Sequence, residues 1–284
     1  MPSFRTDAIV EAIQRILDVP RTDRNSMVTM EIIQPEEARE AYMELCRPHD
    51  DEMEPRNFRY ALLGYGCKPE VVGGDGQFSF DSLTKTLTVV IPNAIHQVPV
   101  VWLNSELHRN WSKIVPGAHF NDFECFGGLT FASFTGPYTY SIKEPDGMIR
   151  ILGQYWPSVV MEVGWREQLV RLKYDRDLWF RGSQGAVRVV IIVKFSKTAT
   201  GVKGLLEITT PNLNGEYTVQ KRSIWPENEE EDPYIFLRDV YGPYRPENCE
   251  FAEDFKLPLR MATLRAEARV HLENLDLVPM ARLA

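Results

Sequence analysis

The chain has 284 residues, of which 44% are apolar and 25% charged, and this is the composition of an ordinary globular protein. Because no run of about 18 apolar residues occurs, the sequence predicts no membrane-spanning segment. The start of the chain lacks the apolar stretch of a secretion signal, and the four cysteines show no paired spacing. These features predict a cytoplasmic or nuclear protein that is not secreted and has no membrane partner.

The N-terminal part of the chain reads as mainly helical. Apolar residues recur at helical spacing near its start, and 35–48 is bounded by prolines, as helices often are. A short strand is predicted between them at 27–33. We expect residues 1–60 to form a helical extension packed on a domain that covers 61–284.

From residue 78 onward, apolar and aromatic runs alternate with turn residues. These runs predict strands at 78–92, 127–134, 138–144, 146–152, 158–163, 186–195, 205–210 and 217–225. Helical spacing of apolar residues predicts helices at 96–111, 166–181 and 259–275. The second of these should pack on the face of the sheet through Trp165, Leu169, Leu172 and Trp179. The order predicts an α/β (α+β) fold, a mixed β-sheet flanked by helices, with extra N-terminal helices and additional antiparallel strands.

Charge is unevenly distributed along the chain. Residues 165–197 contain eight Lys and Arg against three acids, so this segment carries +5 and the remainder −13. A local basic face is compatible with phosphate contacts, and the candidate nucleic-acid-binding residues are Arg166, Arg171, Lys173 and Arg188. The alternative to phosphate binding is a solvated helix surface on which these charges form ion pairs with one another.

One acid, Glu162, interrupts the apolar run SVVMEV. A buried carboxylate is costly unless a partner or a ligand offsets its charge. If 146–151 and 158–163 form an antiparallel hairpin, Asp146 falls opposite Val163 and within reach of Glu162. Two converging carboxylates repel each other unless a proton or a metal lies between them, and Mg²⁺ accepts such oxygen ligands.

Other interpretations of these polar residues stay open. A structural ion pair with Arg150 or Arg188 would also offset the charge of Glu162. Three histidines near the expected core, His96, His108 and His119, are more simply structural groups than ligands or bases.

The elements KEPDG and WPSVVMEVG resemble those of the PD-(D/E)XK nuclease superfamily. The chain is similar in particular to a group of uncharacterised fungal proteins. In these, K-x-PD, WPS-LVVEVG-x-SE, a helix and a G-x-V-+-VVIII strand follow in that order. The corresponding segments here are 143–146, 156–164, 166–181 and 185–193. A strand and helix at 87–108 resemble the preceding part of that group, so the resemblance covers about 85–195.

The resemblance implies a restriction-endonuclease-like fold and metal-dependent hydrolysis of phosphodiester bonds. Asp146 and Glu162 would hold one Mg²⁺ or Mn²⁺, with the carbonyl of Val163 as a third ligand. Many superfamily members place a metal-assisting Glu where this chain has Gln97, which still offers an oxygen but carries no charge.

The chain departs from the superfamily at the lysine that follows the second acid, because Gly164 stands at that position. We take Lys173, in the following helix, as the catalytic lysine in its place; Lys194, in the next strand, is the other candidate. Arg188 offers a positive charge but cannot act as a base, since a guanidinium stays protonated.

These observations predict a metal-dependent endonuclease or exonuclease acting on nucleic acid, DNA in preference to RNA, with homodimer formation left open. The alternative is a catalytically inactive nuclease-like fold that binds nucleic acid or protein, because Gly164 and Gln97 both depart from the superfamily pattern. A purely structural protein, in which Glu162 is an ion-pair partner, is the third interpretation.

Overall fold

The computed structural model describes part of the chain: residues 11, 27–31, 36–38, 40, 60–61, 70–71, 77–90, 94–114, 122–165, 167–212, 214–245 and 251–282. Two compact units result, each described by itself below. Unit 1 consists of Met1–Asn93 and Gly128–Pro145, and unit 2 of Ala94–Gly127 and Asp146–Ala284. The chain therefore leaves unit 2 once and returns to it.

Unit 1 contains a four-stranded antiparallel sheet in the order β1-β5-β4-β7. Its strands are β1 (Met27–Glu31), β4 (Gln77–Asp81), β5 (Thr86–Val90) and β7 (Ile142–Lys143). Phe80 and Leu87 face each other on neighbouring strands and are almost fully buried, which anchors the β4–β5 hairpin. A short pair, β2 (Tyr60–Ala61) with β3 (Glu70–Val71), and the 3₁₀ helix η3 (Gly136–Tyr138) also belong to this unit.

Unit 2 is built on a six-stranded mixed sheet in the order β12-β11-β10-β9-β8-β6. Its strands are β6 (Phe123–Phe126), β8 (Gly147–Ile151), β9 (Val159–Gly164), β10 (Val189–Thr198), β11 (Gly201–Pro211) and β12 (Tyr217–Trp225). β9 and β10 run parallel, and the other neighbours run antiparallel. The mixed α/β class predicted from the sequence is confirmed.

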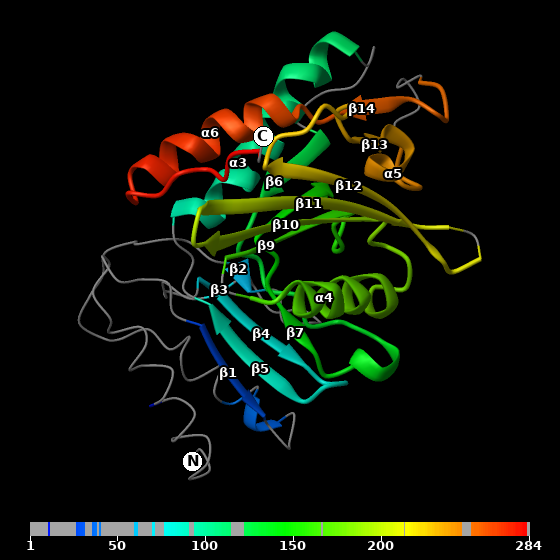
Figure 1. Cartoon of the computed structure of the whole chain (residues 1–284). Helices are drawn as coiled ribbons and strands as arrows, with labels where there is room; N and C mark the ends of the chain where they lie inside the picture. Colours follow the sequence, from blue (N-terminus) through cyan, green and yellow to red (C-terminus); the bar gives the residue numbers. More distant parts are fainter. Residues whose placement is uncertain are drawn as a thin grey trace. The chain divides into compact units, whose positions relative to one another are not determined.

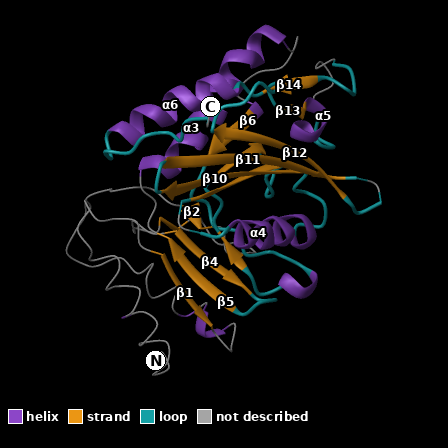
Figure 2. Ribbon diagram, in the orientation of Figure 1, coloured by secondary structure: helices purple, strands orange, loops and turns teal. Residues whose placement is uncertain are grey.

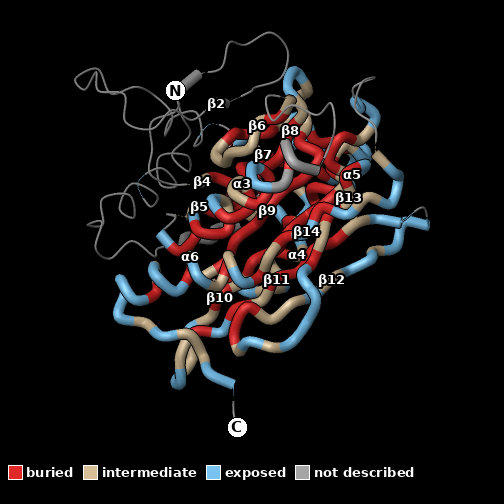
Figure 3. The backbone as a smooth tube through the Cα atoms, turned by 90° about the horizontal axis from the view of Figure 1, so that it is seen from above, coloured by how far each residue is buried: buried red, intermediate tan, exposed pale blue. Residues whose placement is uncertain are grey.

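Helices cover both faces of this sheet (Figure 1). α3 (Ala94–Ile114) and α6 (Met261–Glu273) lie together on one face, and α4 (Leu169–Gly182) lies on the other. α6 contributes the stripe Met261, Leu264, Ala268 and Leu272 to the core, so the predicted C-terminal amphipathic helix is confirmed. As a result of this cover by helices, β9 and β10 lie in the buried interior of unit 2 (Figure 3).

Smaller elements complete the description of unit 2 (Figure 2). They are the antiparallel pair β13 (Tyr234–Phe236) and β14 (Lys256–Pro258) and the short helix α5 (Leu237–Tyr241). Among the described residues, none of the helices combines the length and apolar character needed to cross a bilayer.

The central hairpin matches the prediction closely. β8 and β9 are antiparallel neighbours, and β10 lies in the same sheet, as expected. Gly147 pairs with Met161, so continuing the register by one residue sets Asp146 opposite Glu162 and not opposite Val163. The observed register therefore differs by one residue from the expected register. The loop that connects β8 and β9 fixes the register, and the apolar pattern of the strands does not determine the geometry of that loop.

Three local predictions were wrong. The aromatic segments at 127–134 and 138–144 form few strand residues, namely β7 and a bridge between Phe131 and Lys143. The helix predicted from 166 begins at Leu169. Trp165 was expected on the face of the sheet that α4 covers. It packs instead beside Phe195, in the core on the other face, because neighbouring strand residues point to opposite faces.

Predictions for the N-terminal 60 residues fall mostly outside the described residues. The expected strand is present as β1, and residues 36–38 and 40 are helical, within the helix predicted at 35–48. The proposed division of the chain at residues 60 and 61 stays a prediction.

The core position of α6 gives a stability prediction. Leu264→Ala should lower the free energy of unfolding by about 2–5 kcal/mol, because Leu264 is fully buried and its removal leaves a cavity. Val270→Ala on the same helix should change it by less than about 0.5 kcal/mol, since that side chain is 56% exposed. Urea denaturation of both variants checks this, and equal losses would contradict the placement of α6.

Candidate functional site

The two predicted acids lie side by side on unit 2. Asp146 immediately precedes β8 and Glu162 lies within β9, and both are buried, at 6% and 3% exposure. The backbone N–H of Val163 donates a hydrogen bond of 2.6 Å to Oδ2 of Asp146. This bond holds the Asp146 carboxylate against the Glu162–Val163 peptide, so the structure brings together the acids that the sequence pairs.

Glu162 has a protein donor of its own. The indole Nε1 of Trp179, on α4, donates a hydrogen bond of 2.6 Å to its Oε1. Trp179 is fully buried, and the bond lies between the sheet and the helix. A hydrogen bond from an indole stabilises a buried carboxylate, which explains in part how an acid is tolerated in this strand.

A lysine lies next to Gly164 on the neighbouring strand. Lys194, on β10, is the register partner of Gly164. A Cβ atom on Gly164 would lie 3.2 Å from Cδ of Lys194 and 2.8 Å from Cδ1 of Leu172. The absence of a side chain at 164 therefore makes room for the stem of Lys194 from the neighbouring strand.

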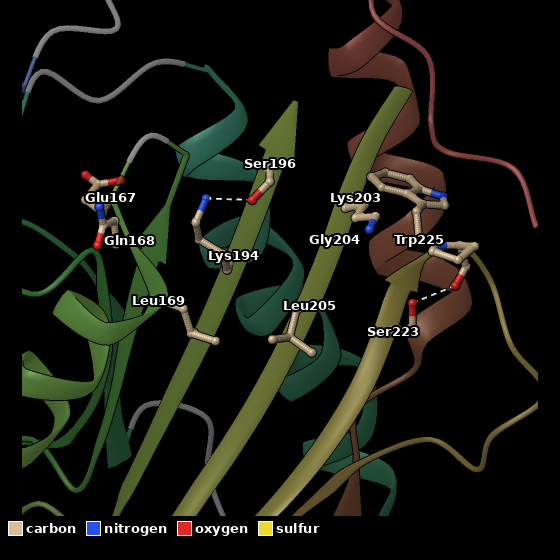
Figure 4. A pocket seen from close by; sticks show the side chains of 11 residues that line it. Glu167, Gln168, Leu169, Lys194, Ser196, Lys203, Gly204, Leu205, Ser223 and Trp225 are labelled. Carbon is tan, nitrogen blue, oxygen red and sulfur yellow. Dashed lines mark hydrogen bonds between the residues drawn. The ribbon is translucent and has the colours of Figure 1, made fainter. Parts of the chain in front are cut away.

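The ammonium group of Lys194 is held in place by several acceptors. Nζ donates to the carbonyl of Trp165 and to Oγ of Ser196, both at 2.9 Å, and to the carbonyl of Phe195. Figure 4 shows it beside Ser196 at the end of β10. Burial lowers the pKa of Lys194, and the nearby carboxylate of Glu167 opposes that shift.

Glu167 and His96 extend this polar group. Oε2 of Glu167 accepts the N–H of Trp165 at 2.9 Å and lies 4.0 Å from Nε2 of His96, at the start of α3. Burial lowers the pKa of His96, Lys194 lowers it further, and Glu167 raises it. A buried carboxylate, a histidine and a lysine thus lie near one another where β9 ends.

Two predicted site residues lie elsewhere. Gln97 is exposed and lines an apolar groove between α3 and α6 with Val98 and Val270, while its neighbour His96 faces Glu167. Lys173 forms an ion pair of 3.6 Å with Glu207 on β11. Neighbouring helical residues point in different directions, so Gln97 points away from the side on which His96 faces Glu167.

Two of the predicted basic residues, Arg171 and Lys173, form ion pairs within the protein. Arg171 pairs with Asp175 one helical turn on, with atoms 3.8 Å apart. Nε of Arg188 lies 3.0 Å from where a Cβ on Gly242 would be, beyond the end of α5. Arg166 lies outside the described residues. The ion-paired surface that the sequence offered as an alternative therefore describes Arg171 and Lys173.

Arg150, considered as a partner of Glu162, pairs instead with Glu124 on β6. Its Nε and NH2 lie 2.7 and 2.6 Å from Oε2 of Glu124, which faces Arg150 across the β6–β8 register. The pattern of alternating residues would have allowed this pairing to be predicted if β6 had been recognised as a strand.

Within the described ranges, no group of three or more His, Cys, Asp or Glu side chains is arranged to hold a metal. The candidate ligand set therefore consists of two carboxylates and a backbone carbonyl. Sequence reasoning did not single out Glu167 or Lys203. Glu167 falls in a charged stretch that resembles a solvated helix start, and Lys203 belongs to a strand of mixed polarity.

No protein-family model matches the chain, and neither a curated protein nor a solved structure matches it.

The Trp179–Glu162 bond predicts an unequal response of two buried tryptophans. Trp179→Phe should lower the free energy of unfolding by about 1–3 kcal/mol more than Trp225→Phe does, because only the former leaves a buried carboxylate without its donor. Trp225 is equally buried, and its Nε1 has no hydrogen-bond partner in the part of the chain that the structure describes. Parallel urea titrations of the two variants measure the difference in their free energies of unfolding. Equal losses would contradict the role of the Trp179 indole as the donor to Glu162.

His96 predicts a pH dependence of stability. In the unfolded chain its pKa is near 6.5, and burial lowers that pKa in the folded protein. Below pH 6.5 the unfolded state binds more protons, so this contribution to stability is present above 6.5 and is lost as the pH falls below it. His96→Gln should flatten the pH dependence of unfolding between about pH 5 and 7. The same slope in variant and wild type would show that His96 does not titrate in this way.

Proposed function

We propose that the protein is a metal-dependent nuclease whose site is formed by Asp146, Glu162 and Lys194. The observation that supports this most directly is their placement on three adjacent strands: Asp146 at β8, Glu162 on β9 and Lys194 on β10 over Gly164. An acid, a second acid and a lysine in this order are what the resemblance to the PD-(D/E)XK nucleases requires. Lys194 takes the role that Gly164 leaves open, in place of Lys173.

The ligand set suits a hard divalent cation. Carboxylate oxygens and a peptide carbonyl are the ligands that Mg²⁺ and Mn²⁺ accept, and one or two protein carboxylates with substrate phosphate often suffice for Mg²⁺. Asp146, Glu162 and the carbonyl of Val163 would hold the ion. When bound, it lowers the pKa of a coordinated water and offsets charge on a phosphate.

The protein's own groups have separate roles in this proposal. The Val163 N–H fixes the orientation of the Asp146 carboxylate, and the Trp179 indole fixes that of Glu162. Lys194 supplies positive charge beside the acids, where negative charge develops on a phosphate under attack. Its ammonium group is already held by the carbonyls of Trp165 and Phe195 and by Oγ of Ser196, so little conformational freedom is left to lose when it acts on a phosphate.

A second candidate is a nuclease-like fold that binds nucleic acid or protein without cleaving. It is favoured by the two hydrogen bonds just described, because each acid already has a donor within the protein. Binding that is tight, unaffected by EDTA and without cleavage would support this alternative. Under either proposal DNA is the first ligand to test, and RNA the second.

Asp146→Asn separates the metal role from a structural one. The variant keeps an oxygen that can accept the Val163 N–H but loses the charge, so we expect an intact fold, no calorimetric signal with Mn²⁺ and no cleavage of plasmid or single-stranded DNA. Asp254→Asn, at an exposed acid of the same unit, is the matched control and should behave as wild type.

The outcomes of this comparison are distinct. An Asp146→Asn variant that unfolds would assign the acid a structural role, and one that folds and still cleaves would place the chemistry elsewhere. Lys194→Met should retain Mn²⁺ binding and lose cleavage by at least about 100-fold, because it removes a positive charge next to the phosphate. Cleavage by this variant at the wild-type rate would remove Lys194 from the proposal.

A further inference from the structure

A cavity of about 650 Å³ opens beside Lys194 in unit 2 (Figure 4). Its walls come from the ends of β10, β11 and β12 and from the segment that leads into α4. The residues that line it are Glu167, Gln168, Leu169, Lys194, Ser196, Lys203, Gly204, Leu205, Ser223, Trp225 and Pro226. A cavity of this volume has room for a nucleotide-sized group.

The strand register places the polar lining residues on one face of the sheet. Ser196 pairs with Lys203, and Lys194 lies two residues before Ser196 on the same strand. Opposed residues of an antiparallel pair, and residues two apart on one strand, point to the same side. Two lysines and a hydroxyl therefore converge on the cavity from adjacent strands.

Backbone irregularity at Gly204 shapes the same wall. The β11–β12 register shifts between Gly204 and Leu205. A Cβ on Gly204 would lie 2.7 Å from Cβ of Ile224, so a larger residue would push the strands apart. Glycine at this position lets β12 close the cavity next to Lys203.

The donors in the cavity outnumber the groups that would repel an anion. Lys203 is exposed and makes no ion pair with any described residue. Ser196 accepts the hydrogen bond from Lys194, which leaves its own hydroxyl hydrogen for another acceptor. The carboxylate of Glu167 accepts the backbone N–H of Trp165 and lies near the ammonium group of Lys194, which offsets part of its charge.

The N-terminus of α4 also favours an anion in the cavity. Gln168, the residue before the helix, makes no side-chain cap, and the first turn contains no acid. The first N–H groups of the helix belong to Leu169 and its successors, and Leu169 lines the cavity. Helix N-termini carry partial positive charge, so this helix end favours an anion in the cavity.

From these observations we infer that the cavity is a phosphate-binding subsite in which Lys203 and Ser196 hold a phosphate of a nucleic-acid strand. The identity of the occupant rests on the proposed nuclease function, whereas its anionic character rests on the lining residues. The subsite would hold a phosphate adjacent to the one that Lys194 contacts and would fix the strand relative to the acid pair. Nucleotides with fewer phosphates should bind less well.

A salt titration with matched variants tests the subsite. Binding of a ten-nucleotide single-stranded DNA in EDTA would be measured by fluorescence anisotropy over a range of salt concentrations. Lys203→Gln should reduce the slope of log affinity against log salt by about 0.7, the value for one phosphate contact on a single strand. Lys197→Gln is the matched control, because Lys197 is exposed on the same strand pair but its side chain points to the other face.

Acetylation of lysines, read by mass spectrometry, distinguishes the sources of the phosphate. The oligonucleotide should protect Lys203 but not Lys197, and inorganic phosphate at the same concentration should protect it less. Protection by inorganic phosphate alone would overturn the nucleic-acid assignment. Protection by neither, or equal slopes for both variants, would overturn the subsite.

The outcome is independent of cleavage. If wild type neither cleaves DNA nor binds Mn²⁺ but Lys203→Gln weakens DNA binding, the proposed nuclease fails while the subsite stands. If wild type cleaves and the two lysine variants behave alike, the subsite fails while the nuclease stands.

Discussion

The parallel pair β9–β10 lies between helices on both faces, and the site depends on this burial. β9 has no exposed residue, so a polar side chain within it must find its partners inside the protein. Glu162 is such a side chain, and Trp179 meets it from α4. Burial of this strand therefore determines which helix residue must be a donor and where the helix must sit.

The same burial links Gly164 to Lys194. On adjacent parallel strands the side chains at 164 and 194 would compete for one volume, and glycine at the first position leaves that volume to the lysine stem. The packing of the two strands thereby determines where the ammonium group of Lys194 lies, next to the carbonyl of Trp165 and near the carboxylate of Glu167.

The sequence allowed the central sheet to be predicted because its strands are long and apolar. The β8–β9 hairpin, the β10 strand and the α6 stripe follow from period-two and helical patterns. The site was less predictable. Whether position 96 or 97 faces Glu167, and which acid Lys173 and Lys194 each lie near, depends on rotations about helix and strand axes that no local pattern fixes.

Aromatic segments gave the least reliable predictions. Residues 127–134 and 138–144 are rich in residues favoured in strands, yet most of them serve in turns and bridges of unit 1. β6 was missed because it has four residues and a mixed burial pattern. In both cases tertiary context overrides intrinsic preference, as it does more often for strands than for helices.

The excursion of the chain out of unit 2 constrains the order of assembly on the ribosome. β6 and β8 are neighbours, but the chain between them, 128–145, belongs to unit 1 and supplies β7, which pairs with β4. The excursion begins and ends at one point, since a Cβ on Gly127 would lie 1.9 Å from the carbonyl oxygen of Asp146. A nascent chain that has emerged only to residue 127 therefore has neither unit complete. Unit 1 has all its residues once residue 145 has emerged, by which point the first segment of unit 2 has already been made and must wait for 146–284.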